Sequence, residues 1–347
     1  MATTRADRGY EYGILLPHFG SAASREHLID DARRLEEYGL DSMWVRDHIV
    51  YHPHPHEDPN QNHVDPFVVL SAIAAVTTRV RLATGTLIPH RHPIYTALLF
   101  GSLDYLAGPG RLIAGFGLGT YQHEFDAVGL SGIDRKKMIR EYVEVLRKLW
   151  TGEVVTHHGT YFDFEEVDIH PVPGEAAAIP IWYGGASKAA VRRAVEYCDG
   201  SLHGWTPVWE FGALVRRMHL LAEEAGREEP PDVGIIPIVV PADSPREAWE
   251  RLDLDRVYAM ATRFYGPPPG KESYESVEDL DDAALVGDAD AIVAGIRRFQ
   301  EQGARHVVLD MRHSFDRWDT LVEFLGRELL PRLHADDGRS GEAREGE

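Results

Sequence analysis

Residues 179–203 read IPIWYGGASKAAVRRAVEYCDGSLH, and this stretch decides the fold class. An apolar run at 179–183 leads into two glycines, an amphipathic helical pattern covers 188–197, and a second apolar run follows at 200–203. Strands that alternate with helices are typical of a parallel sheet, because parallel neighbours need a long crossover connection. The stretch therefore predicts one strand–helix–strand unit.

The same alternation runs along most of the chain. Strand character occurs at residues 12–16, 42–45, 80–87, 112–116, 179–183, 200–203, 233–240 and 306–310. Helical patterns follow each run, for example at 24–38 and 135–150. Eight such units fit a closed barrel, whereas a doubly wound sheet usually has about five to seven strands. We predict an α/β fold, a (β/α)8 TIM barrel forming a single domain over residues 1–333, followed by a disordered polar tail at 334–347.

Two segments interrupt this rhythm and are predicted to be insertions. Residues 153–173 carry two short β-rich runs and favour a small hairpin. Residues 266–282 contain three consecutive prolines and many acidic residues, which favours an exposed loop. The second segment is also compatible with a linker between two domains, although the strand–helix alternation continues beyond it.

Composition limits the partners and the compartment. The 36 basic and 56 acidic residues leave a net charge of −20, which disfavours nucleic acid and anionic membrane surfaces as partners. The longest uncharged stretch, 66–78, is shorter than the roughly 20 residues of a membrane span. The first 13 residues show no apolar core of a signal peptide. A single cysteine, Cys198, cannot form an internal disulfide, so we expect a reducing, cytoplasmic location.

Histidines concentrate where a barrel carries its chemistry, which is in the loops after the strands. Of the 18 histidines, seven lie at or just beyond predicted strand ends: His18, His48, His90, His92, His123, His203 and His313. Four more lie in the loop after the second strand: His52, His54, His56 and His63. This pattern indicates a polar active-site mouth, although a general preference of histidine for loops would explain it too.

The run His52-Pro-His54-Pro-His56 invites a metal interpretation. Alternating prolines keep the chain extended and direct successive histidines apart, whereas zinc sites usually combine such a pair with ligands on rigid elements. We therefore predict no metal, and interpret this loop as a lid over the barrel mouth.

Several motifs together carry a family resemblance. They are WVRDH at 44–48, LATGT at 82–86, RLIAGFGLG at 111–119, LWTG at 149–152, GTYF at 159–162 and IWYGGAS at 181–187. In order and spacing the set resembles the bacterial-luciferase-like superfamily from about residue 12 to residue 330. The resemblance implies a TIM barrel with insertions that binds a flavin, or the deazaflavin coenzyme F-420 (also written F420), across the strand C-termini. It also implies a non-proline cis peptide between Gly85 and Thr86, and possible homodimers.

The residues after the second strand separate the branches of this superfamily. Flavin monooxygenases often carry a Glu-His-His-like run there, and the deazaflavin oxidoreductases often carry Asp-His; this chain has Asp47-His48. We predict an oxidoreductase that transfers a hydride between F-420 and a small organic substrate. The alternatives are a monooxygenase that uses reduced flavin mononucleotide (FMN) and a non-catalytic flavin-binding protein. The acidic chain opposes the anionic tail of F-420, which Arg46, Arg91 and Arg312 near the rim would offset.

Candidate site residues follow from chemistry and from the resemblance. His48 can exchange a proton with a substrate oxygen, since its ordinary pKa lies near working pH; Asp47 serves the ring or orients a neighbour. Gly184, Gly185, Ala186 and Ser187 join a strand to a helix N-terminus and suit a phosphate, unless they form only a tight turn. Gly117 and Gly119, together with Gly115, leave room for a ring, with Gly85 and Thr86 behind it, unless these glycines only relieve a crowded barrel rim. Further candidates are His123 for the coenzyme, and Phe19, Trp205, Trp209, Arg312 and His313 for the substrate pocket.

Overall fold

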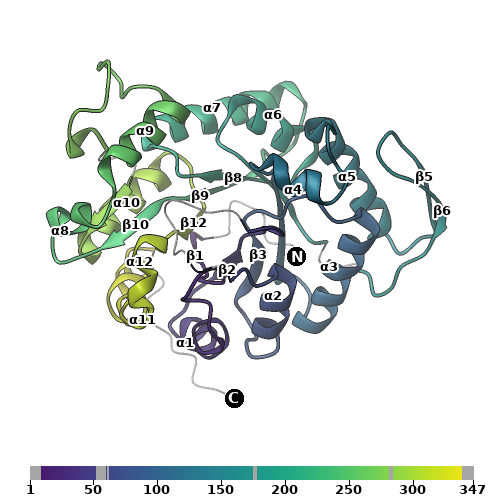
Figure 1. Ribbon diagram of the computed structural model, residues 1–347, viewed down its shortest axis with the longest axis horizontal. Helices are drawn as coiled ribbons and strands as arrows, with labels where there is room; N and C mark the ends of the chain where they lie inside the picture. The colour runs from purple at the N-terminus through teal and green to yellow at the C-terminus, as the bar shows by residue number, and fades with distance from the viewer. Residues whose placement is uncertain (1–8, 52–59, 61, 175–177, 281–283, 338–347) are drawn as a thin grey trace.

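Eight parallel strands close into a barrel (Figure 1). The computed structural model describes residues 9–51, 60, 62–174, 178–280 and 284–337. The barrel strands are β1 (Glu11–Leu15), β2 (Ser42–Val45), β3 (Arg81–Thr84), β4 (Leu112–Phe116), β7 (Ile181–Gly184), β8 (Gly200–Gly204), β9 (Asp232–Ile236) and β12 (His306–Leu309). Around the barrel the order is β1-β12-β9-β8-β7-β4-β3-β2, so the last strand closes against the first. The predicted TIM barrel is confirmed.

Helices surround this barrel on its outside. They are a π-helical turn (Glu26–Asp30) with α1 (Asp31–Glu37), then α2 (Pro66–Ala74), α3 (Pro93–Ala107), α4 (Gln122–Ala127), α5 (Arg135–Leu149), α6 (Lys188–Tyr197), α7 (Val208–Glu224), α10 (Ala289–Glu301), α11 (Trp318–Phe324) and α12 (Leu330–Asp336). The carboxylate of Asp65 accepts the amide hydrogen of Phe67 and so caps α2. Because α12 runs to Asp336, the predicted start of the tail at 334 is wrong; residues 338–347 lie outside the described part.

Tryptophan side chains fill the inside of the barrel. The rings of Trp44 and Trp182 lie 5.8 Å apart within a cluster of buried apolar residues from the eight strands. Glycines on neighbouring strands make room for them. A Cβ atom on Gly200 or Gly234 would come within 2.4 Å or 2.5 Å of the Trp182 ring, and one on Gly13 within 2.9 Å of Trp44 Nε1. The interior is therefore a packed core and not a channel.

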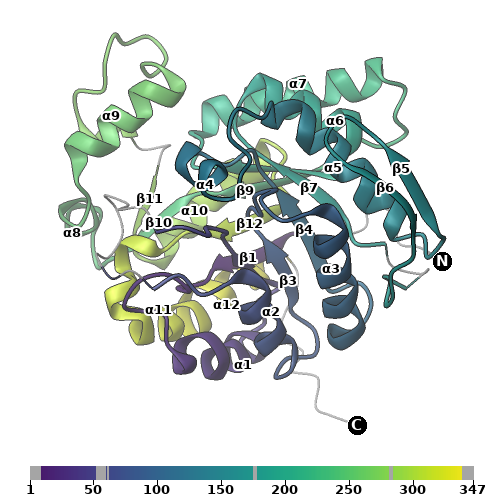
Figure 2. The ribbon, with the colours of Figure 1, turned by 45° about the vertical axis from the view of Figure 1, so that its right-hand side comes forward.

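The predicted hairpin forms on the outside of α5. Its strands β5 (Val155–His158) and β6 (Asp163–Val167) pair antiparallel. The carboxylate of Glu141 on α5 accepts the backbone amides of Thr160, Tyr161 and Phe162, and these bonds fix the hairpin turn to the helix. Figures 1 and 2 show the hairpin at the periphery of the molecule, and its Phe162 ring lies 5.5 Å from that of His92, which follows β3.

The region between the seventh and eighth barrel strands differs from the prediction. The apolar run at 233–240 is two strands, because the barrel strand β9 ends before Pro237 and β10 (Ile238–Pro241) leaves to pair with β11 (Ala284–Gly287), a strand that was not predicted. With α8 (Pro245–Glu250) and α9 (Leu254–Tyr265) these strands build a second, smaller core beside the barrel (Figure 2). The segment 266–282 is not simply exposed, since Tyr274 and Leu280 are buried in that core.

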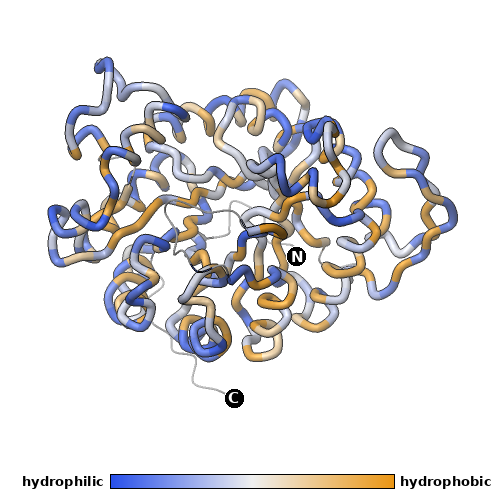
Figure 3. The backbone as a smooth tube through the Cα atoms, viewed as in Figure 1, coloured by the Kyte–Doolittle hydropathy of each residue, from blue (hydrophilic) through white to orange (hydrophobic). Residues whose placement is uncertain are grey.

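Hydropathy follows this arrangement (Figure 3). The strands of the barrel are hydrophobic, and hydrophilic residues alternate with apolar ones along the surrounding helices. Within the described ranges, every helix is too short or too polar to cross a bilayer.

Stability is expected to fall on acidification because of a buried histidine. His203 on β8 is fully buried, its Nε2 lies 3.0 Å from Ser201 Oγ, and burial lowers its pKa to about 4 from the ordinary 6.5. Between pH 6.5 and 4 the unfolded chain therefore binds a proton that the folded chain excludes, so the free energy of unfolding decreases as the pH falls. The loss amounts to about 1.4 kcal/mol per pH unit for this residue.

Urea unfolding at pH 7.5 and pH 5 tests this expectation. His203→Gln, which keeps a polar side chain but does not titrate, should lose about 2 kcal/mol less than the wild type between the two values. Equal losses in both proteins would show that His203 is protonated or accessible in the folded state.

Candidate functional site

A cavity of about 390 Å³ opens at the C-terminal ends of β2, β3, β4 and β7. Nine of the predicted site residues line it: Asp47, His48, Gly85, Thr86, Gly117, Gly119, Gly184, Gly185 and Ser187. The lining also includes Arg46, which was predicted only as a basic residue near the rim. The remaining lining residues were not predicted: Ile88, Leu118, Thr120, Tyr183, Ala190 and Arg193. A larger hollow of about 820 Å³ lies against the second core near Trp249. We assign the site to the smaller cavity, because TIM-barrel chemistry sits at the strand C-termini.

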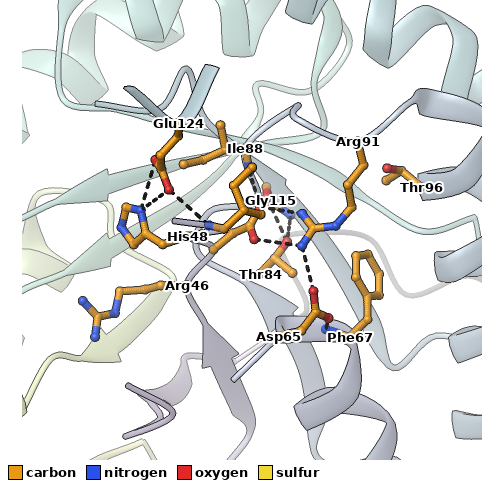
Figure 4. Close-up of polar contacts among 12 residues, drawn as sticks. Arg46, His48, Asp65, Phe67, Thr84, Ile88, Arg91, Thr96, Gly115 and Glu124 are labelled. Atoms are coloured by element: carbon orange, nitrogen blue, oxygen red, sulfur yellow. Dashed lines mark hydrogen bonds and ion pairs between the residues drawn. The ribbon is translucent and has the colours of Figure 1, made fainter. Parts of the chain in front are cut away.

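His48 lies in the wall of this cavity and is held by a buried carboxylate (Figure 4). Its Nδ1 is 3.1 Å from Oε1 of Glu124, which is fully buried and also accepts the backbone amide of Ile49 at 3.1 Å. Burial alone would raise the pKa of Glu124, but the hydrogen bonds from His48 and from the amide of Ile49 help to outweigh it, and the pKa of Glu124 is lowered. The pair therefore consists of an ionised carboxylate that orients an imidazole, an arrangement suited to proton transfer.

Asp47 faces away from His48 and holds the loop after β3. Its Oδ2 accepts the amide of Ile88 at 3.0 Å and Nη1 of Arg91 at 2.8 Å, while its Oδ1 accepts Nη2 of Arg91 at 3.1 Å. Arg91 also donates to Asp65, the cap of α2, at 2.8 Å. Figure 4 shows Arg91 between Asp65 and the segment that carries Ile88. Of the two predicted roles for Asp47, the orientation of a neighbour matches these contacts; contact with the coenzyme stays a prediction.

The glycines of the cavity wall make room for a threonine. A Cβ on Gly117 would lie 2.3 Å from Thr86 Oγ1, and one on Gly184 would lie 2.2 Å from Thr86 Cγ2. A Cβ on Gly115 would lie 2.0 Å from the carbonyl oxygen of Thr84. The space in the Cβ direction of Gly115 and Gly117 is thus taken by Thr84 and Thr86, which matches a crowded barrel rim, and the approach of a ring to the backbone of Gly117 stays a prediction. The predicted cis peptide between Gly85 and Thr86 is present.

The N-terminus of α6 forms another part of the wall. Ser187 caps the helix by accepting the amide of Ala190 at 3.1 Å, and Gly185 has a φ of 149°, which favours glycine. Arg193, almost two turns along α6, reaches the same cavity and donates to the hydroxyl of Tyr183 at 3.2 Å. Helix amides, a serine hydroxyl and a guanidinium together suit an anionic group. Ala186 is not part of the cavity lining.

Most of the predicted substrate-pocket residues lie elsewhere. Phe19 is the exception, since its ring is 5.8 Å from that of His48. Trp205 contacts Tyr265 and the second core, and Trp209 is half-buried in the first turn of α7. Arg312 forms an ion pair with Asp310. Neither Trp209, Arg312 nor His313 lines the cavity.

The other rim histidines serve the structure more than the cavity. His18 is buried, with Nδ1 3.1 Å from the carbonyl of Leu16 and Nε2 3.2 Å from the amide of Arg46, so it joins the ends of β1 and β2. His90 is buried against a phenylalanine, His92 caps α3, and His203 lies inside the protein. His123 contacts Tyr121 and is not part of the lining. The clustering of histidines in the sequence therefore predicted more histidines in the cavity lining than the structure places there.

Two predictions fall on residues that the structure leaves undescribed or partly described. The lid interpretation concerns residues 52–63, of which 52–59 and 61 lie outside the described ranges. Over the part of the chain that is described, three or more side chains of His, Cys, Asp or Glu are nowhere arranged to hold a metal ion.

Three comparisons bear on this geometry. A family model described as luciferase-like monooxygenase matches residues 10–306. The F420-dependent glucose-6-phosphate dehydrogenase of Nakamurella multipartita is 31% identical over 348 residues, which cover 91% of this chain and 96% of that protein.

Among solved structures, an F420-dependent secondary alcohol dehydrogenase in complex with an F420–acetone adduct aligns with a TM-score of 0.75 at 20% identity, covering 94% of this chain and 99% of that one. The oxygenating constituent of 3,6-diketocamphane monooxygenase from Pseudomonas putida, in complex with FMN, aligns with a TM-score of 0.76 at 21% identity, covering 93% and 98%. Both likenesses support the barrel fold. The homodimer and the cytoplasmic location stay predictions.

Replacement of Asp47 tests its role in holding the rim. Asp47→Asn removes the charge that faces the half-buried guanidinium of Arg91, so we expect a loss of about 3 kcal/mol in the free energy of unfolding. The matched variant Asp65→Asn keeps a good helix cap and loses only a more exposed charge, so its loss should stay below about 1 kcal/mol. Denaturant titration measures both, and equal losses would contradict the assignment.

Proposed function

Because the chain belongs to the luciferase-like monooxygenase family, we propose that it is an oxidoreductase that binds the deazaflavin coenzyme F-420 in the rim cavity. There it transfers a hydride between the coenzyme and a small organic substrate. The observation that carries this proposal is the imidazole of His48, held by the buried Glu124, in the wall of a cavity whose lining includes five glycines. The F420-dependent relative, similar over nearly its whole length, supports the choice of coenzyme.

The cavity residues fit such a coenzyme. Backbone at Gly85, Gly117 and Gly119 gives a surface without long side chains, which a planar ring can approach closely. At the far side, the α6 amides near Ser187 and the guanidinium of Arg193 would hold a phosphate. These cationic and amide groups offer local attraction for an anionic molecule within a protein of net charge −20.

The protein itself handles the proton. When bound, a deazaflavin supplies a ring carbon that accepts or releases a hydride. In the oxidation of an alcohol, His48 takes the hydroxyl proton at Nε2; in the reverse direction it returns that proton to the carbonyl oxygen. Glu124 fixes the ring through Nδ1 and stabilises the imidazolium that forms, since its carboxylate is ionised and close.

The loop after β3 is held in place independently of this pair. Asp47 binds Arg91 and the amide of Ile88, and this contact fixes the segment that carries Gly85 and Thr86 relative to β2. Preorganised walls of this kind reduce the entropy lost on binding and position the reacting atoms. Of these two neighbouring residues, Asp47 thus holds the loop in place and His48 transfers the proton.

A parallel titration with F-420 and FMN tests the coenzyme. Quenching of intrinsic fluorescence should show micromolar binding of F-420 and weaker binding of FMN. Gly185→Val should weaken binding of F-420, since its φ of 149° is unfavourable for valine and a Cβ there would lie 2.9 Å from the Cβ of Ala190. Micromolar binding of FMN with no detectable binding of F-420 would instead favour the reduced-flavin monooxygenase.

Replacement of His48 tests the chemical step. His48→Ala should lower turnover by roughly 10²–10⁴, the usual contribution of a positioned acid or base. Coenzyme affinity should change much less, because the anion-binding groups lie on α6. Steady-state rates and the same fluorescence titration separate the two effects, and full turnover in the variant would exclude the role.

A further inference from the structure

We propose that the substrate is an apolar, ring-bearing alcohol or ketone held by an aromatic wall beside His48, and not a sugar phosphate. The wall consists of Tyr51, His63 and Tyr121, supported by Phe19. The inference rests on the proposed function, since His48 would exchange the proton with the substrate oxygen. It departs from the activity named for the dehydrogenase relative.

The backbone builds the support of this wall. Residues 18–20 and 62–64 form an antiparallel bridge at Phe19 and His63, with the amide of Gly20 donating to Asn62 and the amide of Val64 donating to His18. The bridge stacks the two rings, whose centroids are 4.3 Å apart with an interplanar angle of 25°. Phe19 is buried and half-buried His63 lies over it. The stack is therefore set by backbone pairing as well as by side-chain packing.

Two half-buried members of the wall, Tyr121 and His63, lie beside His48. The ring centroid of Tyr121 is 5.6 Å from that of His48, and the centroid of His63 is 6.1 Å from it. Tyr51 extends the wall, with its ring 5.7 Å from His63. These rings come from loops after two different strands, β2 and β4, so they converge only in the folded protein. A substrate oxygen at His48 would thus have its carbon skeleton against aromatic rings.

Charges around the wall are compensated by opposite charges. The guanidinium of Arg46 lies 4.6 Å from the centroid of the Phe19 ring, and its charge, like that of Arg312, lowers the pKa of buried Asp310. Glu124 is engaged by His48 itself. A site for a sugar phosphate needs cations and several hydrogen-bonding groups. The π faces of aromatic rings favour apolar rings instead, because an apolar ring has a small desolvation cost. The chemistry of the wall therefore favours a skeleton with one polar oxygen.

Ligand-observed NMR tests the substrate class without reliance on turnover. Acetophenone, cyclohexanone and glucose 6-phosphate are titrated into the chain alone and into the chain with F-420. We expect saturation transfer to the ring protons of the first two compounds and none to glucose 6-phosphate. Stronger binding of glucose 6-phosphate, or no binding of either ketone, would overturn the inference. Because F-420 binding is measured separately, a failure of the proposed function remains distinguishable.

Variants locate the binding surface. Tyr121→Ala should weaken acetophenone binding roughly tenfold, since a ring contact and its buried area are lost, while Tyr121→Phe should retain it. Affinity for F-420 should be unchanged in both. Tyr105→Ala, which removes a largely exposed ring on α3, is the matched control and should have no effect. His63→Ala gives a second test, and unchanged acetophenone affinity in both Tyr121→Ala and His63→Ala would contradict the proposed wall.

Discussion

The arrangement of the rim depends on how two indole rings fill the barrel. Trp44 and Trp182 occupy the interior, and glycines at 13, 200 and 234 leave the space that they need. Even Gly85 belongs to this packing, because a Cβ there would lie 3.0 Å from Trp44. Trp44 lies three residues before Asp47, and Trp182 two residues before Gly184. With the rings fixed inside, the residues that follow each strand emerge at the same end, where the cavity forms.

The sequence predicts the barrel because its strands are short apolar runs separated by amphipathic helices. The spacing of apolar residues in both kinds of element follows directly from which side chains are buried. Sequence patterns failed between residues 233 and 287, where one apolar run serves two sheets. Pro237 has no amide hydrogen to donate and marks the change, but hydropathy does not register it. The short strand β11 follows an acidic, proline-rich stretch and is buried by tertiary packing, with Ala284 in the second core and Leu285 in the main core.

The sequence predicts those site residues that belong to a local motif. It does not predict the residues that only tertiary contacts bring to the site. The Asp-His pair and the Gly-Gly turn after β7 are visible as motifs beside strands. Glu124 lies 76 residues from His48, and Arg193 faces inward only because of the orientation of α6. The sequence feature that could have pointed to Glu124 is an acidic residue on the short helix after β4. Histidine clustering misled because several rings bind backbone groups, a role that composition does not distinguish from catalysis.

Closure of the barrel has a consequence for synthesis of the chain. The strand β1 pairs with β12, so Glu11 meets His306 only after about 300 residues have been made. Synthesis proceeds at roughly 5–20 residues per second, so the backbone hydrogen-bonding groups on one side of β1 stay unpaired for some tens of seconds. An open strand edge can pair with other chains, so a nascent polypeptide of this architecture has reason to be shielded until its last strand leaves the ribosome. The same adjacency of first and last strands would let new ends be opened in a surface loop elsewhere, with the original ends joined.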